Sequence, residues 1–101
     1  MADASADEPI ERLPVPPFPP QFRDLNDFGK RGIRWGTGEE AAISRMNTIT
    51  AEELQSMGVD HQMAAQWSDF YANEVRRKPT NGSARGRTKL MAHAAGLLEG
   101  R

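Results

Sequence analysis

Apolar residues in the second half of the chain recur at the spacing of a buried helix face. From His61 to about Lys78 they fall at i, i+4, i+7, i+8 and i+12, which is the strongest periodic signal in the sequence. Asp60 is a suitable N-cap for this segment, and Pro79 cannot continue it. The pattern therefore predicts a long helix over 61–78 whose buried stripe is Met63, Trp67, Phe70, Tyr71 and Val75.

A last helix follows a turn at Asn81-Gly82. Ser83 is its expected N-cap. Its predicted buried stripe consists of Leu90, Met91, Ala94, Leu97 and Leu98.

The first half of the chain predicts shorter elements. Phe22, Leu25 and Phe28 are three residues apart, which indicates a helical turn that Gly29 ends. Glycines at 29, 32, 36 and 38 then indicate an irregular loop. Two short helices should follow this loop.

Each of the two short helices has a candidate capping box. Thr37 with Glu40 predicts a helix start at Gly38, and Thr50 with Glu53 predicts a second helix that Gly58 ends in the left-handed conformation. The buried stripe of the first should be Ala42, Ile43, Met46 and Ile49, and that of the second Leu54 and Met57.

No segment alternates with a period of two, so the expected fold class is all-α, with four to five short helices in a compact orthogonal bundle. Residues 1–20 are rich in Ala, Asp, Glu and Pro, and we expect a disordered N-terminal tail there and a single helical domain over 21–101. The run from Pro14 to Pro20 favours polyproline II. It is interpreted as a stiff tether, with Phe18 or Phe22 folded back on a Trp of the same chain; a proline-rich ligand for a partner's aromatic groove is the alternative.

Composition excludes several classes of site. The chain has no Cys, which excludes disulfides and thiolate metal sites, and we expect neither a metal nor a cofactor. No apolar run approaches the roughly 20 residues that span a bilayer, so no membrane association is expected. The acidic start is unlike a signal peptide, which indicates a cytoplasmic protein and leaves secretion by another route open.

Charge is unevenly distributed. Residues 1–74 hold six Lys or Arg against thirteen Asp or Glu, whereas residues 75–101 hold seven against one. Basic residues favour helix C-termini, which explains Arg76, Arg77 and Lys78. Arg85, Arg87 and Lys89 lie instead at a helix start, against the helix dipole. We therefore predict an anion-binding or nucleic-acid-binding face formed by Arg76, Arg77, Lys78, Arg85, Arg87 and Lys89.

Two further patterns point to other functions. The segment from Glu53 to Trp67 has a helix-turn-helix-like spacing, with His61 at the start of its second helix, although a helical hairpin is common in domains that bind no DNA. A metal-independent ribonuclease needs a base, an acid and a cation near one phosphate. Candidate catalytic residues for that alternative are His61, His93, Tyr71 and Arg87.

Trp35 lies in a glycine-rich segment, which fits either a docking surface or a lid over the core. Together with Phe18 it is a candidate for protein interaction. With a core this small, formation of a homodimer would bury additional apolar surface.

Three segments resemble an uncharacterised bacterial family of small helical domains found at the C-termini of polymorphic-toxin-like secreted proteins. They are FGKRGIRWGTGEEAA, ITAEELQSMGVDHQMAAQWSDFY and NGSARGRTKLM, and the similarity runs from about Phe28 to Leu98, with the proline-rich tail outside it. Its most specific pieces are Trp35-Gly36, Gly58-Val59, Trp67 with Phe70-Tyr71, and Ser83 with Arg87, Leu90 and Met91. The family has Asn-Pro-Ser where this chain has Asn81-Gly82-Ser83. The resemblance implies a compact helical module from a bacterium.

These observations favour a small non-enzymatic binding module that uses a basic C-terminal face, with nucleic acid or an acidic protein as partner. A toxin-like ribonuclease domain is the first alternative. A structural or assembly protein that docks through its proline-rich tail is the second.

Overall fold

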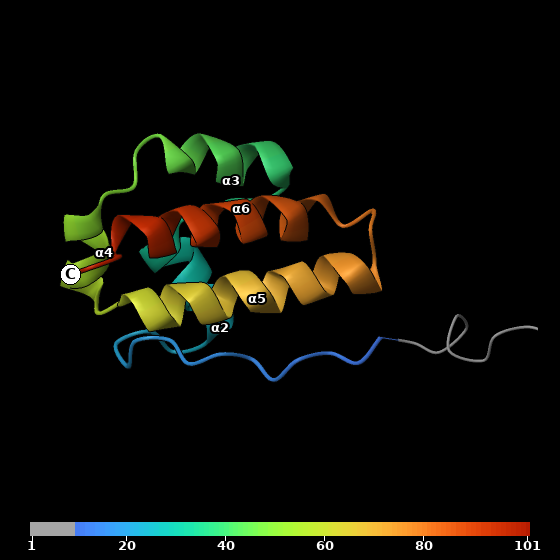
Figure 1. The fold of residues 1–101 in the computed structure, drawn as a ribbon, viewed down its shortest axis with the longest axis horizontal. Coiled ribbons are helices and arrows are strands. Elements are labelled where there is room, and N and C mark those ends of the chain that lie inside the picture. The colour runs from blue at the N-terminus through green and yellow to red at the C-terminus, as the bar shows by residue number, and fades with distance from the viewer. Residues whose placement is uncertain (1–9) are drawn as a thin grey trace, which may run out of the picture.

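The two longest helices form an antiparallel pair. In the computed structural model, which describes residues 10–101, α5 (His61–Arg77) and α6 (Gly82–Leu97) run side by side in opposite directions (Figure 1). Asp60 caps α5 as predicted, because its side chain accepts the N–H of Met63 at 2.8 Å. Asn81 caps α6 by accepting the N–H of Ala84 at 3.1 Å, so the expected cap at Ser83 is wrong.

Helix α3 (Glu39–Met46) lies along α6, and α4 (Ala51–Met57) lies at the end of the bundle near the C-terminus (Figure 1). The predicted cap at Thr50 is confirmed, with its hydroxyl accepting the N–H of Glu53 at 3.1 Å. The predicted Thr37 cap is wrong. Gly38 is the N-cap of α3, and its N–H donates to the Ser83 hydroxyl at 2.9 Å.

The glycine-rich segment is more helical than predicted. A short helix α2 (Leu25–Asp27) continues directly into a π-helix, η1 (Phe28–Ile33). The helical segment therefore runs past Gly29, where it was predicted to end. Glycine is needed here for close approach: a Cβ on Gly29 would lie 2.5 Å from the Trp35 ring, and one on Gly32 would lie 2.7 Å from the Phe22 ring. These glycines therefore serve packing inside a helix, where the sequence alone suggested a loop.

Residues 10–20 form an extended strap along α5 (Figure 1). Backbone carbonyls of the strap accept hydrogen bonds from α5 side chains: Asn73 Nδ2 donates to Glu11 at 2.8 Å and Trp67 Nε1 donates to Pro17 at 2.8 Å. Pro16 is buried as well. The prediction of a disordered tail is therefore corrected for residues 10–20, and residues 1–9 lie outside the described part of the chain.

An aromatic cluster fills the core between η1, the strap and α5. Phe28 is fully buried, and its ring centroid lies 5.5 Å from that of Trp67 and 6.0 Å from that of Trp35. The buried positions of α5 and α6 largely confirm the two predicted stripes. In α3, however, Ile43 is 38% exposed and Arg45 is buried in its place.

The described residues contain no strand, which confirms the all-α fold class. Within residues 10–101, no helix has the length and apolar character needed to cross a membrane.

Candidate anion-binding site

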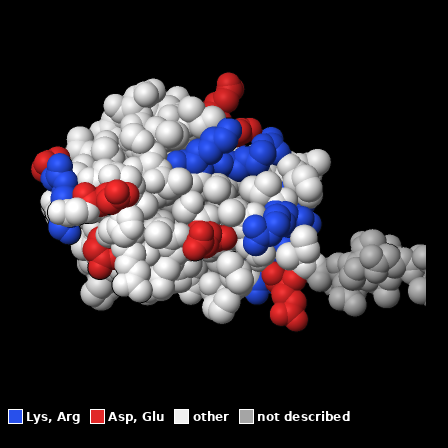
Figure 2. Space-filling model, viewed as in Figure 1, with Lys and Arg blue, Asp and Glu red and all other residues white. Residues whose placement is uncertain are grey.

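The predicted basic residues lie in two groups along the chain, one in the N-terminal half of α6 and one at the C-terminal end of α5. Figure 2 shows one group along the N-terminal half of α6 and a second near the C-terminal end of α5. In the first group, Arg85 and Lys89 both pair with Glu39 of α3, at 3.2 and 3.0 Å. Hydrogen bonds from Lys89 and then Arg85 hold the pKa of Glu39 below its ordinary value. The fold thus supplies a counter-charge for two of the three cations that the helix dipole did not explain.

The second group is also partly engaged within the protein. Arg77 pairs with Glu74 at 3.0 Å and donates to the carbonyl of Ile10. Arg76 donates to the side chain of Asn73 at 3.1 Å. Lys78 is exposed at the C-cap of α5. The six cations therefore do not form one continuous free surface.

Arg87 has a different environment from its basic neighbours. Its guanidinium carbon lies 4.7 Å from the ring centroid of Trp35 and 5.5 Å from that of Tyr71, and one terminal nitrogen donates to the Gly36 carbonyl at 3.2 Å. Its Nε is buried and has no hydrogen-bond partner among the described residues. A guanidinium held against two aromatic rings without a carboxylate is partly desolvated and available to an anion.

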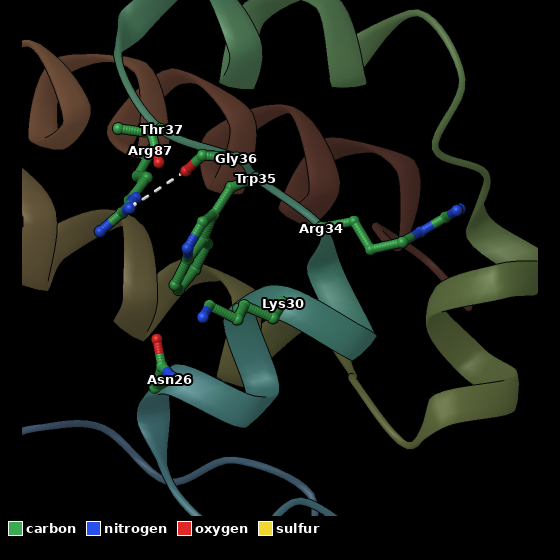
Figure 3. A pocket seen from close by; sticks show the side chains of 8 residues that line it. Asn26, Lys30, Arg34, Trp35, Gly36, Thr37 and Arg87 are labelled. Atoms are coloured by element: carbon green, nitrogen blue, oxygen red, sulfur yellow. Dashed lines mark hydrogen bonds between the residues drawn. The ribbon is translucent and has the colours of Figure 1, made fainter.

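A pocket of about 380 Å³ lies beside this guanidinium. Figure 3 shows Lys30 of η1 and Arg87 of α6 on different sides of the Trp35 indole. Among the described residues, neither cation has a carboxylate within 4.0 Å. The complete lining consists of Asn26, Gly29, Lys30, Arg34, Trp35, Gly36, Thr37 and Arg87, with no acidic residue among them.

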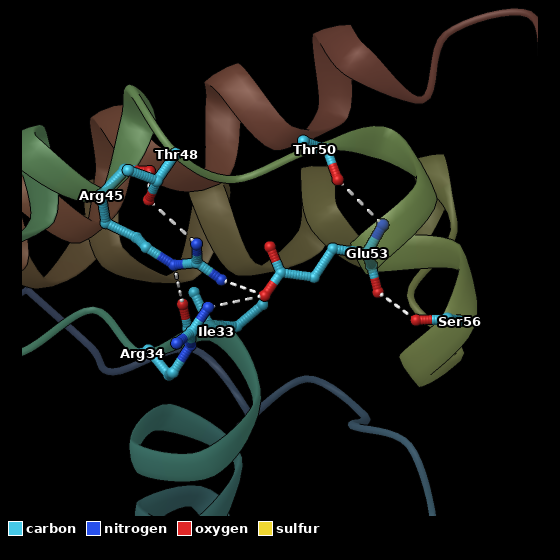
Figure 4. Close-up of polar contacts among 7 residues, drawn as sticks. All are labelled: Ile33, Arg34, Arg45, Thr48, Thr50, Glu53 and Ser56. Atoms are coloured by element: carbon cyan, nitrogen blue, oxygen red, sulfur yellow. Dashed lines mark hydrogen bonds and ion pairs between the residues drawn. The ribbon is translucent and has the colours of Figure 1, made fainter.

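Arg34 lines the pocket, but its charge is directed elsewhere. Figure 3 shows its side chain pointing away from Trp35, and Figure 4 shows it meeting Glu53, with 2.9 Å between the two groups. The same carboxylate pairs with the buried Arg45, which also donates to the Ile33 carbonyl at 2.8 Å. Burial alone would raise the pKa of Glu53, but hydrogen bonds from the two arginines hold it below its ordinary value. This network joins η1, α3 and α4, and it leaves Lys30 and Arg87 as the cations of the pocket.

A second hollow, of about 360 Å³, shares Asn26, Trp35 and Arg87 with this pocket. Its other lining residues are Asp24, Leu25 and Tyr71. Burial raises the pKa of the Tyr71 phenol, and the nearby Arg87 charge partly opposes that shift. The Asp24 carboxylate caps α2 by accepting the N–H of Asp27 at 2.8 Å.

Of the four candidate catalytic residues, Tyr71 and Arg87 lie side by side, with 5.5 Å between the guanidinium carbon and the ring centroid. His61 lies at the start of α5, where its Nδ1 donates to the Ala95 carbonyl at 2.8 Å. Ten helical residues, about 15 Å, separate it from Tyr71. His93 is half-buried on α6, six residues or about 9 Å along the axis from Arg87. The described residues also group no three His, Asp or Glu side chains that could hold a metal ion.

The two residues predicted for protein interaction both contact the core. Phe18 is half-buried and stacks on Phe28, with 5.9 Å between ring centroids. Trp35 is 5% exposed, with one edge lining the pocket. Sequence reasoning did not identify Lys30 or Asn26 as site residues, and the available signal was the combination of Lys30 and Trp35 within one glycine-rich segment.

Comparison with known proteins places the chain in a family. The family described as "Domain of unknown function (DUF4951)" matches residues 2–98. The chain belongs to this family. The match confirms an uncharacterised domain family but begins far before Phe28, so the expectation that the proline-rich segment lies outside the similarity is wrong.

One solved structure similar to this DUF4951 chain is described as "NMR structure of the protein from Acinetobacter baumannii". It is 30% identical, with a TM-score of 0.67, and the similarity covers 96% of this chain and 98% of that one. No curated protein matches the chain.

Proposed function

We propose that the protein is a small binding module that takes an anionic group of its partner, a nucleic acid or an acidic protein, into the pocket beside Trp35. The observation that carries this proposal is the pair of cations, Lys30 and Arg87, which share one pocket that no acidic residue lines. A desolvated cation without a counter-ion is costly to the folded protein, and an anionic ligand would offset that cost.

The surrounding cations would support binding at longer range. Lys78 and Arg76 are exposed at the end of α5 and have no described carboxylate within 4.0 Å. Exposed cations such as these attract a polyanion and raise its association rate, but they give little specificity. Specificity would come from the pocket, where the Arg87 guanidinium is packed against the Trp35 and Tyr71 rings.

Binding is better supported than catalysis. General acid–base chemistry needs its proton donor and acceptor within hydrogen-bond reach of one substrate. The separation of both histidines from Arg87 is unfavourable to the ribonuclease alternative. The assembly alternative is also less supported, because Pro16 and Pro19 of the strap are buried against the protein itself.

A salt titration with labelled tRNA, duplex DNA and polyglutamate tests the proposal. We expect at least one probe to bind at low salt and to be released as salt rises. Lys30→Gln should weaken that binding about tenfold or more, since hydrogen bonds between charged groups are worth roughly 1.5–3 kcal/mol. Lys78→Gln makes the same charge change outside the pocket and is the matched control.

The outcomes distinguish the candidate functions. Equal losses in the two variants would mean that diffuse charge, and not the pocket, binds the partner. Shortening of the tRNA would instead support the ribonuclease alternative. Absence of binding to all three probes would contradict the proposed function.

A further inference from the structure

We infer that the group held in the Trp35 pocket is a phosphate monoester, the terminal phosphate of a nucleotide or of a phosphorylated side chain. This inference rests on the proposed function and specifies its ligand. It follows from three properties of the pocket: its charge, its hydrogen-bond donors and the packing of the Trp35 indole that lines it.

The charge of the pocket matches a dianion. Lys30 and Arg87 contribute two positive charges, and the third cation of the lining, Arg34, is paired with Glu53 at 2.9 Å. A phosphate monoester carries a charge of about −1.5 to −2 at neutral pH. A phosphodiester or a carboxylate carries only one negative charge and would leave one cation without a partner.

The polar side chains that face the pocket are rich in donors. An ammonium, a guanidinium and an indole N–H donate and do not accept, whereas the oxygens of an ionised phosphate only accept. Figure 3 shows the indole nitrogen of Trp35 on the side of the ring toward Arg87, with no hydrogen bond to another lining residue. Asn26 and Thr37 add groups that can donate as well as accept. These donors come from α2, η1, α6 and the loop before α3, so they reach the pocket from four separate parts of the chain.

The Trp35 indole, which lines the pocket, is held in place by packing. Gly29 lies against the indole so closely that a Cβ there would be 2.5 Å from Trp35 Nε1. Trp35 is itself packed edge-on against Tyr71, with 5.3 Å between ring centroids. The indole N–H is therefore held in position before a ligand binds, which lowers the ordering cost of binding.

The two tryptophans provide an internally controlled measurement. Trp67 Nε1 donates to the Pro17 carbonyl at 2.8 Å, away from the pocket, whereas the Trp35 indole edge lines it. In a two-dimensional ¹⁵N–¹H spectrum of the full chain, we expect 5′-AMP and O-phosphoserine to shift the Trp35 indole cross-peak saturably and to move the Trp67 cross-peak much less. Dimethyl phosphate and acetate, at the same concentration and ionic strength, should bind at least about tenfold more weakly than 5′-AMP and O-phosphoserine.

The variants keep the test independent of folding. Lys30 is exposed, so Lys30→Gln should preserve the spectrum and weaken 5′-AMP and phosphoserine binding about tenfold, with Lys78→Gln as control. A response to both 5′-AMP and O-phosphoserine would identify the phosphate group as the ligand. A response to only one of them would also identify the molecule that carries the phosphate. Equal binding of dimethyl phosphate or acetate would overturn this inference while leaving the proposed function in place. No shift of the Trp35 cross-peak with any of the four anions would overturn the inference, while a probe that still binds in the salt titration would preserve the proposed function.

Discussion

The indole nitrogen of Trp67 donates a hydrogen bond to the main-chain carbonyl of Pro17, 2.8 Å away and 50 residues earlier in the chain. Trp67 is fully buried, and a buried N–H without an acceptor costs about 1–3 kcal/mol. The strap therefore completes the core by supplying an acceptor that no helix of the bundle provides for this group.

Removal of residues 1–20 should destabilise the domain. The truncation deprives Trp67 of its acceptor and uncovers apolar surface of α5, so the free energy of unfolding should fall by at least about 2 kcal/mol. Urea unfolding measures the change. Val15→Ser alters an exposed strap side chain and should stay within about 0.5 kcal/mol of the parent. An unchanged melting temperature after truncation would instead favour the assembly alternative.

Two glycines of α6 should respond to alanine in opposite directions. A Cβ on Gly86 would lie 2.7 Å from the Glu39 carbonyl oxygen, so Gly86→Ala should force α3 and α6 apart and cost about 1–3 kcal/mol. Gly96 has nothing within 4 Å of its Cβ position, and Gly96→Ala should stabilise the same helix by about 0.5–1 kcal/mol. Thermal unfolding of both variants gives the comparison, and equal effects would contradict the close helix packing at Gly86.

Glu39→Gln should strengthen binding of a polyanion. The substitution removes the counter-charge of Arg85 and Lys89, which would then be available to phosphates. The slope of log affinity against log salt should steepen by about one unit for each additional phosphate contact. Glu40→Gln changes the same charge on an exposed neighbour and is the control. Identical slopes in all three proteins would show that this part of α6 does not contact the partner.

Stability should fall in acid. The Arg31 side chain, with a further hydrogen bond from the Arg23 main chain, holds the pKa of Asp27 well below its ordinary value, and the pKa of Glu39 is lowered as well. Because the unfolded chain binds protons first, this stabilisation is complete above about pH 5 and is lost as pH falls through the lower pKa values of the folded state. Asp27→Asn should flatten the acid limb of the unfolding free energy, and an unaltered limb would contradict the ion pair.

Tyr71 is the single tyrosine of the chain, so its titration can be followed by ultraviolet absorbance. Burial raises the pKa of its phenol above the ordinary value of about 10. Stability from this group is present below that ordinary value and is lost as pH rises through the folded pKa. Arg87→Gln should raise the midpoint further, because the Arg87 charge opposes the shift. Circular dichroism at the same pH values distinguishes titration in the folded state from unfolding.

Local signals predicted most of the helices. The Asp60 and Thr50 caps, the left-handed Gly58 and the apolar stripes of α5 and α6 depend on residues within a few positions of one another, so they could be read from the sequence. The strap could not, because its order depends on Trp67 and Asn73, more than 45 residues away. Gly29 and Gly32 were misinterpreted for a similar reason: the aromatic rings that require them lie elsewhere in the chain.

The candidate site was predicted in part. Charge patterning identified Arg87, and the glycine-rich context identified Trp35, but the two are 52 residues apart and nothing in the sequence brings them together. The pairing of Glu39 with Arg85 and Lys89 is equally non-local, so the sequence predicted a broader free basic face than the structure has. Lys30 was missed because a single lysine is a weak signal, even in the same glycine-rich segment as Trp35.

The geometry of the pocket depends on the number of residues in the π-helical turn η1 as well as on their identity. The carbonyl of Gly29 accepts the N–H groups of both Arg34 and Trp35, at 2.8 and 3.3 Å, so this turn accommodates more residues than an α-helical turn would. Deletion of one residue between 28 and 33 would remove the extra residue of this turn and change the spacing that sets Gly29, Lys30 and the Trp35 indole against one another. Among relatives of this chain, an alignment gap in this segment should therefore mark loss of the pocket even where the equivalents of Lys30, Trp35 and Arg87 are all retained.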